Sequence, residues 1–406
     1  MEKIKVIDAI MGSGKTSWAI QHMTDAPSHK RFIYITPFND EVSRIKESVT
    51  SRTFRSTNND DYQGKKMHVL KEWIADGADI VSTHALFQKA DDELIELLKE
   101  AGYTLMLDEV MDVVNVAPII QRDIRILMDG GTTISIDEHN RVVWIGEDDY
   151  VGGRFQDIME LAKAGTLFYH RGQFLIWTFP PRIFTTFDEV YCMTYLFDAQ
   201  IQRYYYELHE IEYEYRSVRK CGERYELCEY DRMREGREEL FALIDLYSGP
   251  LNDIGKQRNA MSATWFRNAK AERLKDVRNS AYNYFYNICG ARSRDSLWTT
   301  KKDAKNGGPS FKVRSYNEAF LHLNARATNE YSDRWALAYL FNRYMHPHER
   351  VFFEDRGITV NEQLVAASDL LQWIWRSRIR KGEPIRLFLP SSRMRSLLIA
   401  WSRYEI

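Results

Sequence analysis

The 406-residue chain has little of what marks secreted, disulfide-bonded or membrane-bound proteins. Its four cysteines form no CxxC pair, and no group of histidines and cysteines has zinc-binding spacing. No apolar run approaches the roughly 20 residues that a membrane-spanning helix needs. The chain opens with Met-Glu-Lys and passes directly into a predicted core strand, so we expect no signal peptide. These absences predict a soluble, cytoplasmic protein that contacts no membrane and keeps its thiols free.

An excess of charge of one sign is also absent. The formal net charge is -2, so the whole chain is no electrostatic trap for nucleic acid, and any such surface must be local. Arginine is nevertheless concentrated near the end of the chain, between Arg376 and Arg403. No internal repeat, low-complexity tract or long Pro/Gly linker interrupts the sequence. The length predicts two or three domains.

The most informative stretch that is present runs Ala9-Ile10-Met11-Gly12-Ser13-Gly14-Lys15-Thr16. An apolar strand precedes it and a helical pattern follows it. Strand, glycine-rich turn and helix in this order predict a phosphate-binding loop, because backbone N–H groups and the helix N-terminus attract anions. Ala9 stands where the general pattern has glycine, and a chance glycine-rich turn is the alternative interpretation. The residues expected to bind ATP are Met11, Gly12, Ser13, Gly14, Lys15, Thr16 and Ser17.

The first 110 residues alternate between strand-like and helical patterns. Predicted strands cover residues 32–36, 78–83 and 104–108, and an amphipathic helix covers residues 92–101. This alternation predicts an α/β fold with a parallel sheet. Ligands of such sheets bind at the carboxyl ends of the strands, where Thr36, Thr83 and Asp108 lie together with the phosphate loop.

Later segments follow other patterns. Residues 132–136 and 141–145 predict a β-hairpin, and residues 173–178 predict an apolar strand. We interpret residues 116–180 as a β-rich insertion in a first domain of residues 1–200, which returns to its sheet through strands at 187–191 and 193–197. Residues 201–255 form a connecting arm or accessory element. A second α/β domain covers 256–406, with strands at 296–299, 319–323, 336–340 and 385–389 and a helix at 361–380.

Asp108 and Glu109 follow the third apolar strand. In an ATPase with a phosphate loop, a carboxylate in this place holds Mg²⁺ and its neighbour polarises the attacking water. We therefore expect Thr16 and Asp108 to bind the metal, with Lys15 on the terminal phosphates and Glu109 as the general base. The alternative is an acidic pair favoured by a helix N-terminus.

Several motifs in this order resemble those of the superfamily 2 helicases, and small bacteriophage helicases in particular. Gly12-Ser13-Gly14-Lys15-Thr16 is similar to their first motif, and Tyr34-Ile35-Thr36-Pro37 to the next. The segments Ser82–Phe87 and Asp108-Glu109-Val110-Met111 are similar to two more, although Val110 and Met111 depart from DEAD and DEAH. Thr194-Tyr195 lies where the family has its coupling motif, with Ser262-Ala263-Thr264 as a rival. Residues 324–333 and 372–380 resemble the fifth and the final motif.

This resemblance implies two tandem RecA-like domains with Mg²⁺ and ATP bound in the cleft between them. Gln372 and one arginine would complete the catalytic site, and the choice among Arg376, Arg378 and Arg380 stays open. Nucleic-acid contacts are expected from Thr36, Pro37, Thr83, His84, Arg326, Thr328 and Asn329.

The function that the resemblance implies is an ATP-dependent DNA helicase of phage replication or recombination. It would act in the cytoplasm of the bacterial host, as a monomer, on single-stranded or forked DNA, together with replication or recombination proteins. Two alternatives remain open: a duplex translocase, remodelling or annealing ATPase that separates no strands, and a nucleotide-gated binding protein.

Overall fold

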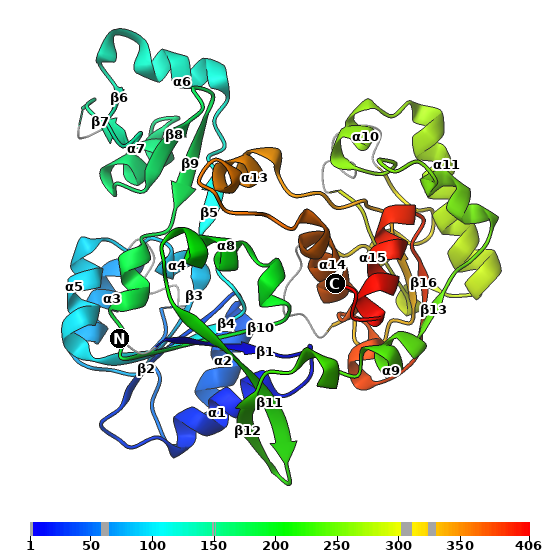
Figure 1. Ribbon diagram of the computed structural model, residues 1–406, viewed down its shortest axis with the longest axis horizontal. Helices are drawn as coiled ribbons and strands as arrows, with labels where there is room; N and C mark the ends of the chain where they lie inside the picture. The colour runs from blue at the N-terminus through cyan, green and yellow to red at the C-terminus, as the bar shows by residue number, and fades with distance from the viewer. Residues whose placement is uncertain (1–2, 58–64, 148–149, 151, 302–310, 324–329) are drawn as a thin grey trace. The chain divides into compact units, whose positions relative to one another are not determined.

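In the computed structural model the chain forms two compact units (Figure 1), and residues 3–57, 65–147, 150, 152–301, 311–323 and 330–406 are described. The first unit comprises Met1–Asp8, Lys15–Leu227 and His346–Val360, and the second Ala9–Gly14, Cys228–Met345 and Asn361–Ile406. Within the described ranges, no helix has the length and apolar character to cross a bilayer.

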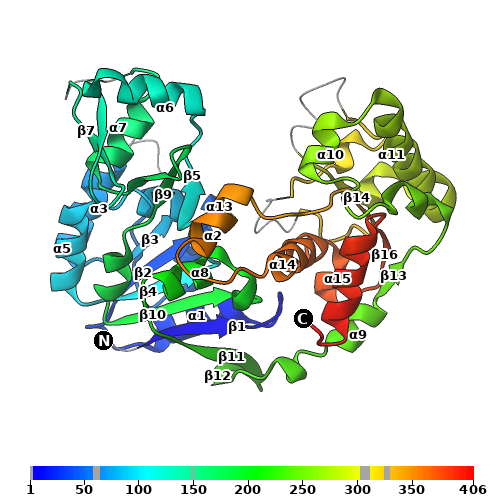
Figure 2. The same cartoon turned by 45° about the horizontal axis from the view of Figure 1, so that its top comes forward.

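A seven-stranded sheet forms the centre of the first unit, in the order β12-β11-β1-β10-β4-β2-β3 (Figure 2). All pairings from β11 to β3 are parallel. Every residue of β4 before Asp108 is buried, as expected for a parallel strand that is covered on both faces. The strands are β1 (Ile4–Asp8), β2 (Arg31–Thr36), β3 (Ile80–Thr83), β4 (Tyr103–Asp108), β10 (Glu189–Thr194), β11 (Tyr213–Cys221) and β12 (Arg224–Glu229).

Helix α5 of this unit begins and ends where local sequence signals place it. In α5, the Asp91 side chain accepts a hydrogen bond from the Leu94 backbone nitrogen, and Gly102 ends the helix in the left-handed region, with a φ of 64°. Its observed range matches the predicted helix 92–101. The helices are α1 (Lys15–Asp25), α2 (Asn39–Ser48), α3 (Lys66–Ala75), α4 (His84–Phe87), α5 (Asp92–Ala101) and α8 (Ile201–Leu208).

Between β4 and β10, where the sequence predicts a β-rich insertion, the chain forms antiparallel strand pairs that include a hairpin. Three strands form an antiparallel sheet in the order β5-β9-β8, and β6 pairs with β7. Helix α13 (Pro347–Glu354) comes from much later in the sequence and packs against β5. The other elements of the insertion are β5 (Val114–Val116), α6 (Gln121–Met128), β6 (Ile134–Ile136), β7 (Val142–Trp144), α7 (Gln156–Lys163), β8 (Leu167–His170) and β9 (Phe174–Thr178).

The chain returns to the large sheet through one strand, so the prediction of strands at both 187–191 and 193–197 was wrong. Strand β10 ends at Thr194, and a short 3-10 helix, η4, covers Phe197–Ala199. The physical reason is the backbone of Leu196, whose φ of 51° is incompatible with a continuing strand.

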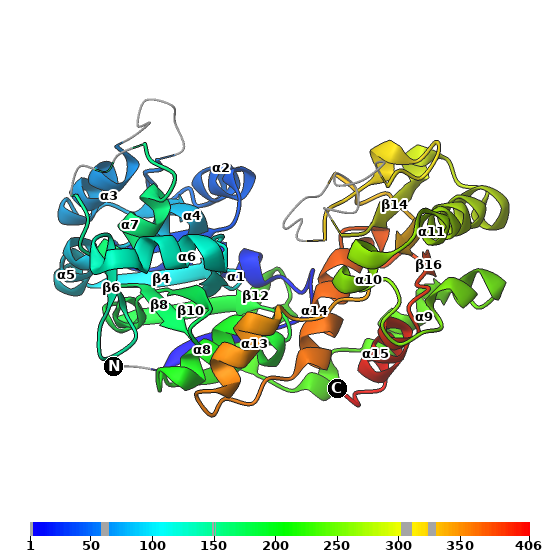
Figure 3. The same cartoon turned by 90° about the horizontal axis from the view of Figure 1, so that it is seen from above.

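The second unit contains a four-stranded parallel sheet in the order β13-β16-β15-β14. Figure 3 shows α14 beside α15, against which it packs. The strands are β13 (Ile244–Leu246), β14 (Ser296–Thr299), β15 (Ala336–Tyr339) and β16 (Ile385–Phe388). The α-helices are α9 (Arg237–Ala242), α10 (Ala263–Asn268), α11 (Ala271–Asn283), α14 (Glu362–Ile374) and α15 (Ser392–Ser402).

Two predicted elements of this unit differ from the observed ones. Residues 319–323 contain the end of a 3-10 helix, Asn317–Ala319, and a single β-bridge from Phe320 to Trp298 in place of a strand. The predicted helix 361–380 stops at Ile374, and a separate 3-10 helix, η10, covers Arg378–Lys381. Ser377, which separates them, has extended backbone angles and its hydroxyl donates to the Ile374 carbonyl oxygen at 2.7 Å.

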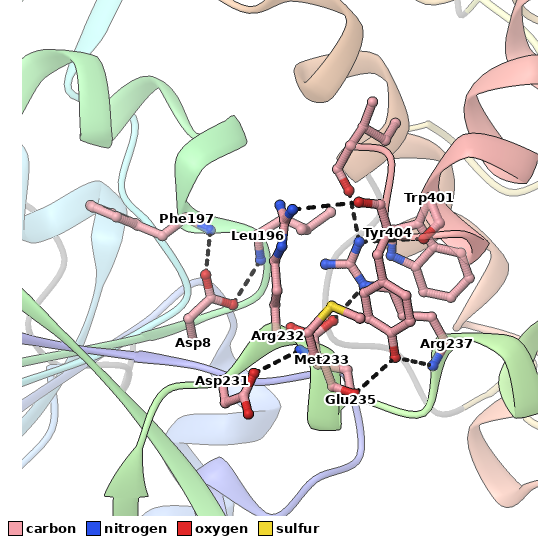
Figure 4. A network of polar contacts seen from close by, with 11 residues as sticks. Asp8, Leu196, Phe197, Asp231, Arg232, Met233, Glu235, Arg237, Trp401 and Tyr404 are labelled. Atoms are coloured by element: carbon pink, nitrogen blue, oxygen red, sulfur yellow. Dashed lines mark hydrogen bonds and ion pairs between the residues drawn. The ribbon is translucent and has the colours of Figure 1, made fainter.

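The end of the chain is fixed within the second unit by one buried arginine (Figure 4). Arg237 is 1 % exposed. Its guanidinium donates to the carboxylate of Glu235 at 2.8 Å and to the carbonyl oxygens of Trp401 at 3.3 Å and Ile406 at 2.7 Å. These bonds compensate for the cost of burying the charge and join α9 to α15 and to the segment that follows it.

Candidate nucleotide-binding site

The glycine-rich loop connects the end of β1 at Asp8 to the start of α1 at Lys15. Gly12 and Gly14 have φ angles of 89° and 100°, which side chains with a Cβ rarely adopt. The Ser13 backbone nitrogen donates to the Ile10 carbonyl oxygen at 3.2 Å and closes the turn. The loop therefore has the tight backbone and the following helix N-terminus that form a phosphate-binding nest.

Glu109 lies directly after β4 in a strained backbone conformation. Its φ is 65°, in the left-handed region, and its backbone nitrogen donates to the Met193 carbonyl oxygen at 2.9 Å. A residue other than glycine in this region costs about 1–3 kcal/mol, and such strain persists where the surrounding structure holds it. The strain concentrates at the residue that the sequence assigns to proton transfer.

The carboxyl group of Asp108 is surrounded by charges of both signs. Burial, together with the neighbouring charges of Glu109 and Glu41, raises the pKa of Asp108 to about 7, although the Tyr34 hydroxyl and Lys15 act to lower it. The effect of Lys15 means that its ammonium group lies within electrostatic reach of Asp108. The structure thus brings together three predicted catalytic residues, Lys15, Asp108 and Glu109, at the carboxyl edge of one sheet.

A divalent cation fits this edge of the sheet. In the described part of the chain, no group of three or more histidine, cysteine or acidic side chains forms a ready-made metal site. Mg²⁺ is usually bound by one or two protein groups together with substrate phosphates, and the Thr16 hydroxyl and the Asp108 carboxylate are oxygen donors of the type it takes. The two adjacent carboxyl groups, whose mutual repulsion raises the pKa of Asp108, supply the negative charge that such a cation would offset.

Four of the predicted nucleic-acid contacts lie near this edge. Thr36 and Thr83 are register partners at the ends of β2 and β3, and Pro37 follows Thr36. Thr36 is fully buried, and its hydroxyl has no hydrogen-bond partner among the described residues. The His84 Nε2 lies 3.1 Å from the Asp108 carbonyl oxygen, which can only accept, so Nε2 carries the proton. Arg326, Thr328 and Asn329 lie outside the described residues.

The structure distinguishes the three candidate arginines, all of which lie in the second unit. Arg376 follows α14 and is 9 % exposed. The Nε of Arg378 donates to the Pro384 carbonyl oxygen at 2.5 Å, and its guanidinium lies over the Trp335 ring, 5.8 Å from the centroid. These two residues, with Arg378, line an open cavity of about 390 Å³. Arg380 is exposed.

Arg380 also lies close to Gly12 of the glycine-rich loop, and residues 9–14 of that loop belong to the same unit. A Cβ placed on Gly12 would be 3.7 Å from the Arg380 carbonyl oxygen and 3.8 Å from its Cγ. Gln372 is half-buried on α14. Of the four residues predicted from the final motif, Arg380 therefore combines exposure with proximity to the loop.

Two residues that hold these segments in place were missed by the sequence analysis. Asp8 is 2 % exposed and accepts two backbone hydrogen bonds from the turn after β10 (Figure 4). Gln202 is fully buried and accepts a hydrogen bond from the Met111 backbone nitrogen at 2.7 Å. Asp8 had a readable signal, because it is the carboxylate that ends an apolar strand immediately before the phosphate loop. Gln202 had none, since a glutamine in a helix usually faces solvent.

Comparison with known proteins identifies proteins that are similar to this chain. Residues 114–177 match the model of the YonV middle domain, and residues 238–402 match that of the YonV C-terminal Rossmann-like domain. A solved structure, of the DUF1998 helicase MrfA bound to DNA and AMPPNP, is 9% identical with a TM-score of 0.34; the alignment covers 100% of this chain and 48% of that one. The SPbeta prophage-derived protein YonV of Bacillus subtilis (strain 168) is 42% identical, over 99% of both chains. Because this identity extends over nearly the whole of both proteins, the chain belongs to the YonV family.

Proposed function

We propose that this chain is a nucleic-acid-dependent ATPase, a helicase-like motor of superfamily 2 with two RecA-like domains. The observation that supports the proposal is the meeting of Lys15, Asp108 and Glu109 at the carboxyl edge of one parallel sheet. A glycine-rich loop with two left-handed glycines adjoins them. Phosphate loop, metal-binding carboxylate and adjacent carboxylate are the parts that ATP hydrolysis requires.

Each group has a separate task in this proposal. ATP would supply the phosphoryl group, and Mg²⁺ would supply positive charge against its phosphates. Lys15 would neutralise the terminal phosphates, and Thr16 and Asp108 would hold the metal. Glu109 accepts a proton from the attacking water, and its strained backbone keeps the carboxylate in a fixed direction. An arginine of the cluster 376–380 stabilises the charge that develops on the transferred group.

The partner that fits this proposal is single-stranded or forked DNA. Threonine hydroxyls and backbone N–H groups at strand ends suit phosphate oxygens, which carry no sequence information. Thr83 and His84 lie next to Asp108, since the His84 ring is bonded to the Asp108 carbonyl group. A shift of Asp108 when nucleotide binds would therefore also move Thr83 and His84 and change their contacts with the nucleic acid.

The decisive measurement is the rate of ATP hydrolysis without polynucleotide and with single-stranded DNA, duplex DNA or RNA. We expect stimulation by single-stranded DNA. The Lys15→Ala and Glu109→Gln variants should each lose about 100-fold or more of the stimulated rate, since positioned charges and general bases contribute at that scale. Glu109→Gln should still bind ATP. A wild-type protein that binds nucleotide but hydrolyses none under any condition would instead be a nucleotide-gated binding protein.

A second measurement separates a helicase from a motor that moves along a duplex without opening it. Strand release from forked and gapped DNA is followed together with ATP hydrolysis. A helicase releases a strand in proportion to hydrolysis, whereas a translocase hydrolyses ATP without release.

A further inference from the structure

Asp8 is a buried carboxylate that accepts two backbone hydrogen bonds from within the first unit. It ends β1, is 2 % exposed, and its two oxygens accept from the backbone nitrogens of Leu196 and Phe197, at 2.9 and 2.8 Å (Figure 4). Burying a carboxylate is costly unless it is well paired. A hydrophobic residue, such as its neighbour Ile7, could not accept these two backbone hydrogen bonds. The carboxylate therefore has a task beyond filling the core.

The turn that Asp8 holds is strained. Leu196 has a φ of 51°, a conformation that costs a leucine about 1–2 kcal/mol. The hydrogen bonds from Leu196 and Phe197 to one carboxylate offset this cost and fix the direction in which the chain leaves β10. Thr194 is the register partner of Asp8, so the turn begins at the same level of the sheet as the phosphate loop.

The same strand end also holds Glu109. Strand β10 lies between β1 and β4, and the carbonyl oxygen of Met193 accepts from the Glu109 backbone nitrogen at 2.9 Å. Asp8 and Glu109 are thus hydrogen-bonded to the end of β10 from opposite sides. Asp8 accepts from the turn at 196–197, and Glu109 donates to residue 193. In each of these attachments one residue has a left-handed backbone conformation: Leu196 in the first and Glu109 in the second.

We propose that Asp8 is a positioning residue that sets Glu109 relative to the phosphate loop through the end of β10. The loop begins at the residue after Asp8, so a displacement of the loop by nucleotide moves the Asp8 carboxylate, the turn at 196–197 and the Glu109 backbone together. This inference rests on the proposed ATPase function, because Asp8 is inferred to position Glu109, the proposed general base.

The test is Asp8→Asn in the full chain. Asparagine retains one acceptor but faces the second backbone N–H with its own NH₂ group. We expect kcat for ATP hydrolysis to fall by about tenfold or more, as small displacements of a catalytic group do, with ATP affinity within about threefold of wild type. Asp8→Glu, which keeps the charge on a longer side chain, should recover part of kcat.

The matched control is Asp79→Asn. Asp79 accepts from the Phe32 backbone nitrogen at 2.8 Å at the opposite, amino edge of the same sheet, and also pairs with Arg52. Its loss disturbs the sheet without touching the β10 terminus, so kcat should stay near the wild-type value at temperatures where the variant is folded. Equal losses of kcat in both variants, or a loss of ATP affinity without a loss of kcat, would overturn the positioning role.

Hydrogen exchange measured by mass spectrometry separates failure of this inference from failure of the proposed function. In Asp8→Asn, peptides covering 193–198 and 105–112 should both exchange faster than in wild type, whether or not the protein hydrolyses ATP. Faster exchange confined to 193–198 would refute the connection to Glu109 and leave the ATPase proposal intact. Faster exchange of both peptides in Asp8→Asn, together with a wild-type protein that has no ATPase activity, would refute the function and keep the mechanical connection. If Asp8→Asn has no cooperative unfolding transition, the same exchange comparison is made on Asp8→Glu.

Discussion

The side-chain oxygen of Gln202 accepts a hydrogen bond from the backbone nitrogen of Met111 at 2.7 Å. Gln202 lies on α8 and is fully buried, and its amide nitrogen donates to the Tyr206 hydroxyl at 2.6 Å. Met111 belongs to the segment that leaves the sheet after Glu109. A buried amide from a distant helix thus determines the path of the chain next to the proposed general base.

Replacing this amide should weaken the fold and the activity together. Gln202→Leu leaves the buried Met111 nitrogen without its acceptor, which costs about 1–3 kcal/mol of the free energy of unfolding. Urea denaturation measures the loss, and the ATPase rate of the folded variant should fall because the segment after Glu109 shifts. Tyr205→Phe on the same helix is the control. It removes the hydrogen bond from the Tyr205 hydroxyl to the Phe179 carbonyl oxygen, and should lower stability but not turnover. Unchanged stability of Gln202→Leu would contradict the structural role.

Thr36 offers a test of a polar group without a partner. Its hydroxyl is buried and has no hydrogen-bond partner in the described part of the chain. Thr36→Val replaces it with a methyl group of similar size, so the free energy of unfolding should stay within about 0.5 kcal/mol of wild type or rise. Because the hydroxyl is fully buried, it cannot contact nucleic acid directly, so the affinity for single-stranded DNA should also stay unchanged. A clear loss of stability would mean that the hydroxyl has a structural partner.

Glu189 should make the fold sensitive to acid. Burial alone raises the pKa of Glu189, but the Lys30 ammonium, the Tyr191 hydroxyl and Lys5 outweigh it and lower the pKa from 4.5 to about 2. A carboxyl group whose pKa is lower in the folded state contributes stability above its unfolded pKa, and this contribution is lost as the pH falls from 4.5 towards 2. Urea unfolding at pH 6, 4.5 and 3 should show this decline.

The same titration of Glu189→Gln should be flatter, because a neutral amide has no such linkage. Glu96→Gln, which removes a carboxylate from the more exposed pair with Arg182, serves as the control and should keep the wild-type slope. Parallel curves for wild type and Glu189→Gln would show that other groups cause the acid sensitivity.

The parts of the fold that could be predicted from sequence are those that local patterns determine. The helix Asp92–Ala101 has its N-cap Asp91 and its C-terminal Gly102 in the sequence, and the hairpin around residue 138 has alternating strands on either side of a polar turn. The glycine pattern of the phosphate loop requires left-handed backbone, and both glycines have it.

What could not be predicted depends on contacts between distant residues. Leu196 has no local reason to adopt a left-handed conformation; it does so because Asp8, on another strand, binds its backbone nitrogen. The helix predicted to reach residue 380 stops at Ile374, although no proline or glycine marks the end. The pairing of the Asp108–Met111 segment with β10 and α8 likewise depends on which strands become neighbours, which composition and periodicity do not encode.

The last prediction concerns which of the three arginines is catalytic and which has a structural role. Arg378 already has structural partners: its Nε donates to the Pro384 carbonyl oxygen and its guanidinium lies over the Trp335 ring. Arg378→Ala should therefore lower the free energy of unfolding by about 1 kcal/mol and leave kcat unchanged.

Arg380 is exposed, and its backbone and Cγ lie next to the position of a Cβ on Gly12. If it stabilises the transferred phosphoryl group, Arg380→Ala should lower kcat on the order of 1,000-fold with little change in ATP affinity or stability, since such arginines act in the transition state. Arg380→Lys should rescue only a small part, because an ammonium group cannot make two parallel hydrogen bonds to a phosphate. Single-turnover ATPase measurements on Arg376→Ala, Arg378→Ala and Arg380→Ala decide the question. A large loss of kcat in Arg376→Ala alone would move the catalytic role to the buried arginine at the end of α14 and make Arg380 a surface residue.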